Sequence, residues 1–189
     1  MTTAAWRPPW VAVVFDTHKA YIANVGDSRG YLWRQGVLTQ ITKDQSLVAK
    51  LVEEGAITEE EAENHPRRNV ILYSLGSERS PKIDLFERFL EPGDLILLCS
   101  DGLTRHVSDG EMAEFLHNGD LDQVSQTLIE LANNRGGQDN ISVGLLRFQG
   151  DGLQPTAVPS YQADNSKTLI GAQTAVSSPR PAATKAYGG

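Results

Sequence analysis

Short apolar runs separated by brief polar turns occupy the first part of the chain. Residues 10–15, 20–25, 30–34 and 37–41 each form such a run. The segments between them are shorter than the dozen or more residues that a parallel crossover needs. We therefore predict antiparallel strands joined by hairpins, with Gln35 and Gly36 forming one of the tight turns.

The apolar spacing changes to a helical period after the fourth run. Residues 47–52 place Leu and Val side chains on one helix face, and Gly55 follows as a C-cap. Thr58 and Glu61 have the spacing of a capping box, which predicts a short acidic helix that Pro66 ends.

Two more helices are predicted in the second half of the chain. Ser108 and Glu111 form another capping-box pattern, which starts a helix that runs to about His117. A longer helical period follows Gly119 and ends at Gly136. The buried face of this last helix is expected to consist of Val124, Leu128, Leu131 and Ala132.

Further apolar segments predict strands at 69–73, 83–89, 95–99 and 141–148. The strands fall into two groups, and the helices are segregated between them. A parallel α/β fold would need strands and helices to alternate throughout, whereas residues 10–41 contain no helical pattern. The sequence therefore predicts an α+β fold, an antiparallel β-sandwich flanked by helices.

The chain changes character near its end. Gly, Pro, Ala, Ser and Thr dominate residues 149–189. Such a composition cannot bury enough apolar surface to offset the conformational entropy of the chain. We predict one folded domain over 1–148 and a disordered tail over 149–189.

Composition and charge restrict the classes of partner and the cell compartment that we expect for this protein. The formal net charge of −7, with no stripe of Lys and Arg, argues against a nucleic-acid partner. No apolar run is long enough to cross a bilayer, and no signal-peptide pattern opens the sequence, so we expect no membrane partner. The single cysteine, Cys99, lies in an apolar run, which favours a buried thiol and a cytoplasmic protein.

Three acidic residues lie at the ends of predicted strands: Asp27, Asp101 and Asp139. A carboxylate at the end of a buried strand must be hydrogen-bonded, paired or bound to a cation, because a bare buried charge is costly. Oxygen ligands without a His or Cys cluster favour Mg²⁺ or Mn²⁺ over Zn²⁺. For each acid taken alone, a role in a turn or a helix cap is the competing interpretation.

Three segments carry a resemblance to a known family. They are residues 23–29 (ANVGDSR), 97–103 (LLCSDGL) and 136–143 (GGQDNISV). Over residues 2–148 the chain resembles the PPM family of metal-dependent protein serine/threonine phosphatases (type 2C), in its bacterial form. The resemblance implies a β-sandwich flanked by helices and hydrolysis of phosphoserine and phosphothreonine proteins by a metal-activated water. It also implies Mg²⁺ or Mn²⁺ as the cofactor, and a role opposite a serine/threonine kinase in bacterial signalling.

The resemblance also assigns roles to individual residues. Asp101 and Asp139 match metal ligands of the family, and Asp27 matches an acid that serves a third, more weakly held metal together with Asp101. Arg29 is expected to anchor its own loop through an acidic neighbour. No catalytic side chain other than these metal ligands is identified in the chain.

Some family motifs do not occur in this sequence. The family carries an Asp-Gly-x-Gly-Gly turn whose Asp bridges two metals, and an Arg that clamps the substrate phosphate, both in its first half. The chain therefore resembles the C-terminal portion of a family member, without the N-terminal strands. We expect metal affinity and turnover to be lower by orders of magnitude without those groups, and an apolar surface to be left uncovered. Two interpretations stay open, an incomplete phosphatase and a non-catalytic module of the same fold that binds or regulates.

Overall fold

The computed structural model describes residues 8–76, 82–118, 120–137 and 139–150 of the 189. The predicted tail lies outside the described residues from residue 151 onward, so the prediction that it is disordered stays a prediction. No helix in these ranges is long and apolar enough to cross a membrane.

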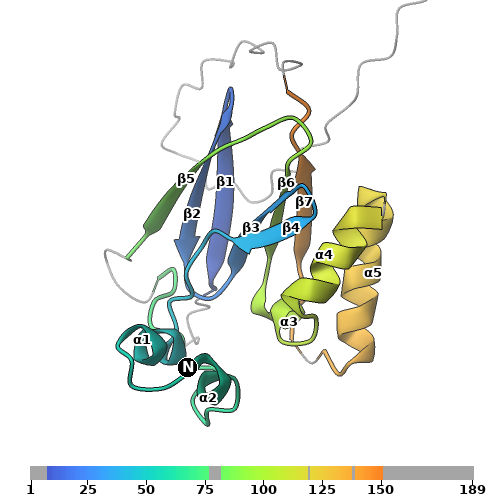
Figure 1. Cartoon of the computed structure of the whole chain (residues 1–189). Helices are drawn as coiled ribbons and strands as arrows, with labels where there is room; N and C mark the ends of the chain where they lie inside the picture. Colours follow the sequence, from blue (N-terminus) through green and yellow to red (C-terminus); the bar gives the residue numbers. More distant parts are fainter. Residues whose placement is uncertain (1–7, 77–81, 119, 138, 151–189) are drawn as a thin grey trace, which may run out of the picture. The chain divides into compact units, whose positions relative to one another are not determined.

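The first sheet has three antiparallel strands. β1 (Trp10–Asp16), β2 (Lys19–Val25) and β5 (Asp84–Phe89) lie in the order β1-β2-β5 (Figure 1). The alternation of side chains along these strands explains their packing, because one face is buried or partly buried and the other face is largely exposed.

The second sheet has four antiparallel strands in the order β4-β3-β6-β7. They are β4 (Val37–Gln40), β3 (Arg29–Arg34), β6 (Leu95–Cys99) and β7 (Val143–Arg147). A tight turn joins β3 to β4, and both Gln35 and Gly36 have positive φ there, as expected for a hairpin of two loop residues. Cys99 pairs with Arg29 of β3 and with Val143 of β7, so these residues form one row across the sheet.

Two apolar clusters hold the layers together. One lies between the sheets and joins Ile22 of β2 to Ile96 of β6 and Phe148. The other lies on the opposite face of the four-stranded sheet, where Leu97 and Cys99 pack with side chains of the helices. Neighbouring residues of β6 therefore point alternately into the two clusters. The predicted α+β fold, an antiparallel sandwich flanked by helices, is confirmed.

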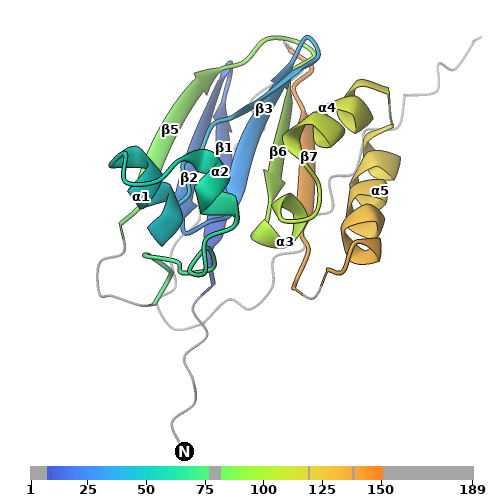
Figure 2. The same ribbon diagram turned by 60° about the horizontal axis from the view of Figure 1, so that its bottom comes forward.

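Five helices occur in the described residues: α1 (Leu47–Glu53), α2 (Glu59–Glu63), α3 (Asp101–Thr104), α4 (Asp109–Asn118) and α5 (Leu121–Asn134). The helices α3, α4 and α5 lie beside β6 and β7 in both views (Figures 1 and 2). The predicted capping box at Thr58 is present, because its hydroxyl accepts from Glu61 N and Glu61 accepts from Thr58 N. Ser108 and Glu111 make the same reciprocal bonds at the start of α4.

Some predicted elements need correction. Residues 69–73 are not a strand. They touch residues 45–47 through a single bridge at Ile71, with Leu47 N donating to Val70 O and Leu72 N to Gln45 O. The predicted strand 141–148 is shorter, at Val143–Arg147, and Leu131 on α5 is only partly buried. The short helix α3 was not predicted.

One sheet face exposes large apolar side chains. These side chains come from β1, β2 and β5, alternate with buried ones, and are Trp10, Val14, Tyr21, Leu85 and Phe89. Val14 lies directly opposite Tyr21, so the exposed groups are neighbours on one face. Leu85 is 76% exposed and Phe89 is 66% exposed, which fits the expected uncovered apolar surface.

We expect this face to drive self-association of the chain. Changing Val14, Leu85 and Phe89 together to Thr should lower the fraction of oligomers in sedimentation velocity, because it removes exposed apolar area while Thr, a β-branched residue, still suits a strand. Val37→Thr is the matched control, since Val37 is 63% exposed on the other sheet. A triple variant that associates as strongly as the unmodified chain would contradict this assignment.

Candidate functional site

The three candidate acids lie at the same end of the sandwich. Asp27 lies in the turn between β2 and β3, Asp101 follows β6, and Asp139 precedes β7. Because β3, β6 and β7 are antiparallel neighbours whose row ends at Arg29, Cys99 and Val143, their connecting turns meet at this edge. The structure therefore places all three candidate acids at one edge, although among the described residues no three acidic, His or Cys side chains converge on a single point.

Asp101 begins α3, the short helix that the sequence did not predict. It is the first residue of α3, and its backbone oxygen accepts from Arg105 N at 3.0 Å. The helical turn places Arg105 over the side chain of Asp101, with Nη2 2.5 Å from Oδ2. Arg105 also approaches Asp139, with Nη1 3.6 Å from Oδ2. One guanidinium thus spans two of the three acids.

The turns that carry Asp101 and Asp139 are fastened to each other. Ser100 Oγ donates to Asn140 O at 2.8 Å and accepts from Ser142 N at 3.0 Å. Gly102 makes this approach feasible, since a Cβ there would lie 2.6 Å from the carbonyl oxygen of Asn140. Any larger residue at 102 would push the two acidic turns apart.

Asp27 is the most buried of the three acids, at 7% exposure. Its Oδ1 is buried and has no hydrogen-bond partner among the described residues. Burial raises the pKa of Asp27 to about 6, and the nearby charge of Asp101 adds to the increase. A carboxylate oxygen without a partner, beside a second carboxylate, is the kind of group that a cation would satisfy.

The turn of Asp27 is held from behind by polar contacts. Gln45 Oε1 accepts from Gly26 N at 2.9 Å, and Gln45 N donates to Gly26 O at 2.9 Å. Gly26 has φ +102°, and a Cβ there would lie 2.7 Å from Cβ of Pro9. Asn24 Nδ2 donates to both Gly26 O and Lys43 O at 3.2 Å. The position of Asp27 thus depends on the segment that follows β4.

Arg29 anchors the other side of this turn, as the sequence predicted. Its Nε and Nη2 bind both oxygens of Asp44 at 2.8–3.1 Å. Its Nη1 donates to Tyr31 Oη, which in turn donates to Asp109 at the start of α4. This chain of contacts links the turn of Asp27 to the helical layer.

Sequence reasoning missed two residues that shape the site, Arg105 and Gln45. Arg105 stands four residues after Asp101, which is the spacing of a helical ion pair. That signal was readable, but its contact with Asp139 depends on the pairing of β6 with β7. Gln45 carried no local signal, since its partner Gly26 is distant in sequence.

The donor chemistry at this edge fits a hard divalent cation. The site offers carboxylates, one of them with a buried unpartnered oxygen, and Mg²⁺ is commonly held by one or two carboxylates while it keeps several waters. Within the described residues, no three Asp, Glu, His or Cys side chains converge closely enough to hold a metal by themselves. The acids therefore fit as part of a ligand set.

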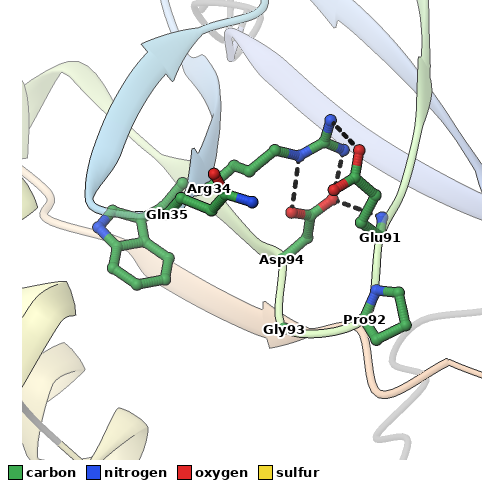
Figure 3. A pocket seen from close by; sticks show the side chains of 7 residues that line it. Arg34, Gln35, Glu91, Pro92, Gly93 and Asp94 are labelled. Atoms are coloured by element: carbon green, nitrogen blue, oxygen red, sulfur yellow. Dashed lines mark hydrogen bonds and ion pairs between the residues drawn. The ribbon is translucent and has the colours of Figure 1, made fainter.

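A pocket at the opposite end of β3 has a different character. Figure 3 shows Arg34 directed at Asp94 and Glu91 across this pocket. Arg34 Nε and Nη2 lie 2.9 and 2.7 Å from the two oxygens of Asp94, which is 2% exposed. Nη1 lies 2.9 Å from Glu91 Oε1. The charged groups here are already paired with one another, so we assign this pocket a structural role.

Comparisons with known proteins relate the chain to phosphatases. The family model described as Protein phosphatase 2C matches residues 10–53. The serine/threonine phosphatase stp of Listeria innocua is 44% identical over 137 residues, which is 72% of this chain and 54% of that protein. PstP of Mycobacterium tuberculosis, a serine/threonine protein phosphatase, is 46% identical over 163 residues, which is 84% of this chain and 31% of that protein. The chain spans about half the length, or less, of these relatives.

Solved structures agree with the sequence matches. A Streptococcus agalactiae serine/threonine phosphatase superposes with a TM-score of 0.70 at 43% identity, covering 72% of this chain and 57% of that one. The catalytic domain of PstP, solved in complex with two manganese ions, superposes with a TM-score of 0.62 at 42% identity, covering 72% of this chain and 56% of that one.

We expect Asp27→Asn to stabilise the chain in EDTA at neutral pH. The pKa of Asp27 is raised, so folding favours its protonated form, and the free energy of unfolding should fall as pH rises from about 4 to about 6. One pKa unit corresponds to about 1.4 kcal/mol, and because Asn also needs partners we expect a net gain of about 1–2 kcal/mol. Urea unfolding between pH 4 and 8 measures the free energy of unfolding of both proteins. An equal dependence of that free energy on pH in Asp27→Asn and in the unmodified chain would contradict the prediction.

Arg34→Met should destabilise the fold by about 3 kcal/mol, because it leaves the buried Asp94 carboxylate without its cation. Lys19→Met is the matched control. Lys19 pairs with Glu87 at 2.6 Å, but both side chains are at least 32% exposed, so we expect a much smaller loss of stability than for Arg34→Met. Urea unfolding of both variants measures the two losses of stability. Equal losses would mean that the burial of Asp94 does not make its ion pair more important than the exposed one.

Proposed function

Because the chain belongs to the PPM (type 2C) family of protein phosphatases, we propose that it acts in a metal-dependent protein serine/threonine phosphatase. The proposed substrates are proteins that carry phosphoserine or phosphothreonine, and the proposed cofactor is Mg²⁺ or Mn²⁺. We also propose a serine/threonine kinase as the opposing partner and the cytoplasm as the compartment.

The observation that carries this proposal is a buried carboxylate oxygen without a partner, on Asp27, next to a second acid, Asp101. Asp27 lies beside Asp101 at the edge where the β6 and β7 turns are fastened together. The chain offers no His or Cys cluster in the described ranges that would suit a different metal. A relative whose catalytic domain binds two manganese ions superposes on this chain, which supports the same class of metal.

Each acid has a proposed role. Asp101 and Asp139 would hold the metal through carboxylate oxygens, and Asp27 with Asp101 would serve a further, weaker cation. A bound divalent cation supplies Lewis acidity, which activates a water for attack on phosphorus and screens the charge of the phosphate ester. The fold's own contribution is orientation, because Ser100 and Gly102 hold the two acidic turns at contact distance.

The environment of Asp27 suits a metal ligand, because its buried Oδ1 has no hydrogen-bond partner among the described residues and would be satisfied by a cation. Gln45 and Asn24 fix the turn from behind, which keeps the carboxylate facing the same edge as Asp101.

Phosphate release from a phosphothreonine peptide tests the proposal. We expect release that depends on Mn²⁺ and stops with EDTA. We expect Asp101→Asn to lower it at least about 100-fold, because loss of a ligand should cost more than the roughly 10–100-fold that is typical of residues behind the ligands. Asp122→Asn, an exposed acid in the first turn of α5, is the matched control and should retain the rate.

Hydrolysis that persists in EDTA or in Asp101→Asn would contradict the proposed role of these acids. If the folded chain released no phosphate in the presence of Mn²⁺, the alternative of a non-catalytic module of the same fold would be favoured. Circular dichroism of each variant distinguishes loss of function from loss of fold.

A further inference from the structure

We propose that Arg105 is an internal counter-cation of this site, which competes with a divalent metal for Asp101 and Asp139 and so lowers metal affinity. The inference rests on the proposed function in one respect, that these acids bind a divalent cation. It goes beyond that function because it assigns control of metal occupancy to a basic side chain that is not itself a ligand.

The contacts of Arg105 are divided between two carboxylates. Nη2 lies 2.5 Å from Asp101 Oδ2, and Nη1 lies 3.6 Å from Asp139 Oδ2. The two acids come from different turns, one after β6 and one before β7. The planar guanidinium suits this arrangement, because its nitrogens point in fixed directions toward two separate acceptors.

An ordinary surface ion pair does not explain this geometry. A pair spaced by four residues on an exposed helix involves two residues of that helix and is worth little. Here Asp101 is only 17% exposed, and the second acid follows Arg105 by 34 positions, from 105 to 139. Arg105 therefore spans the two turns that carry the proposed metal ligands, with a close contact to Asp101 and a longer one to Asp139, which is 52% exposed.

The positive charge of Arg105 reduces the repulsion between the neighbouring carboxylates. Asp27 and Asp101 lie close enough to repel each other, and Asp27 Oδ1 has no partner. Among the described cations, Arg105 is the one that pairs with Asp101 and with Asp139. Its positive charge offsets the repulsion among the acids that would otherwise oppose their convergence.

A metal and Arg105 cannot share the same oxygen without repulsion. Mg²⁺ binds carboxylate oxygens at about 2.0–2.1 Å, so a cation on Asp101 Oδ2 would lie beside Nη2. Arginine keeps its proton at any physiological pH, so it can relieve this repulsion only by moving away. At 36% exposure, the side chain can swing into solvent from the C-cap of α3.

Mn²⁺ binding measured by calorimetry on the whole chain tests the proposal without any assay of activity. We expect Arg105→Gln to tighten the Kd about tenfold, equal to about 1.4 kcal/mol, because the competing charge is gone. Arg147→Gln is the matched control. It removes the same charge from the other end of β7, where Arg147 is exposed, and should change the Kd less than twofold.

A second measurement uses the unmodified chain. Phenylglyoxal reacts with accessible guanidinium groups, and peptide mass spectrometry gives the rate at each arginine. We expect Mn²⁺ to accelerate modification of Arg105 several-fold, because the metal releases it from Asp101, and to leave Arg147 unchanged. This readout stands even if Arg105→Gln folds poorly.

The outcomes separate the two proposals. If Asp101→Asn abolishes Mn²⁺ binding but Arg105→Gln binds no more tightly than the unmodified chain, the role of Arg105 is overturned and the metal site stands. If neither the unmodified chain nor Arg105→Gln binds Mn²⁺, both the counter-cation role and the metal-binding part of the proposed function are wrong. Slower modification of Arg105 with Mn²⁺ would also overturn the competition.

Discussion

The pairing of β6 with β3 on one side and with β7 on the other is the constraint on which the site depends. Arg29, Cys99 and Val143 form one row, and each candidate acid lies within four residues of that row. If the pairing register of β6 shifted by one residue, Leu97 would point into the cluster between the sheets, where Ile96 now packs. The partition of apolar side chains between two clusters therefore fixes where the carboxylates meet.

The site is held together by contacts that lie outside it. Converging acids repel one another, and the burial of Asp27 adds a cost. Gln45 and the Arg29 pair with Asp44 fix one turn, while Ser100 fastens the other two. This pattern is typical of functional sites, where a locally unfavourable arrangement persists because the surrounding fold determines it.

The sequence predicted most elements because their signals are local. Alternation marked β1 to β4, and capping boxes marked the starts of α2 and α4. The signal failed at 69–73, where β-branched residues suggested a strand but only Ile71 finds a pairing partner. It failed again at α3, because four residues are too few to show a helical period.

The sequence identified the candidate acids from their place at strand ends, but it did not predict the environment of each acid. The depth of Asp27 and the second contact of Arg105 both arise from strand pairing between distant segments. Family resemblance supplied the expected roles of Asp101 and Asp139. It carried no information on Arg105, which lies outside the roles that the resemblance assigned.

Cys99 gives the chain a built-in reporter of the packing between the four-stranded sheet and the helices. Its thiol is buried at the end of β6, on the face that the helices cover, and burial raises its pKa to about 12. Since only the thiolate attacks alkylating agents, the native state is protected both sterically and chemically. Alkylation must then proceed through molecules in which the helices have moved away from this face of the sheet, so its rate follows the population of that opened state. The sheet that aligns the acids thus carries one chemical label for its packing against the helices.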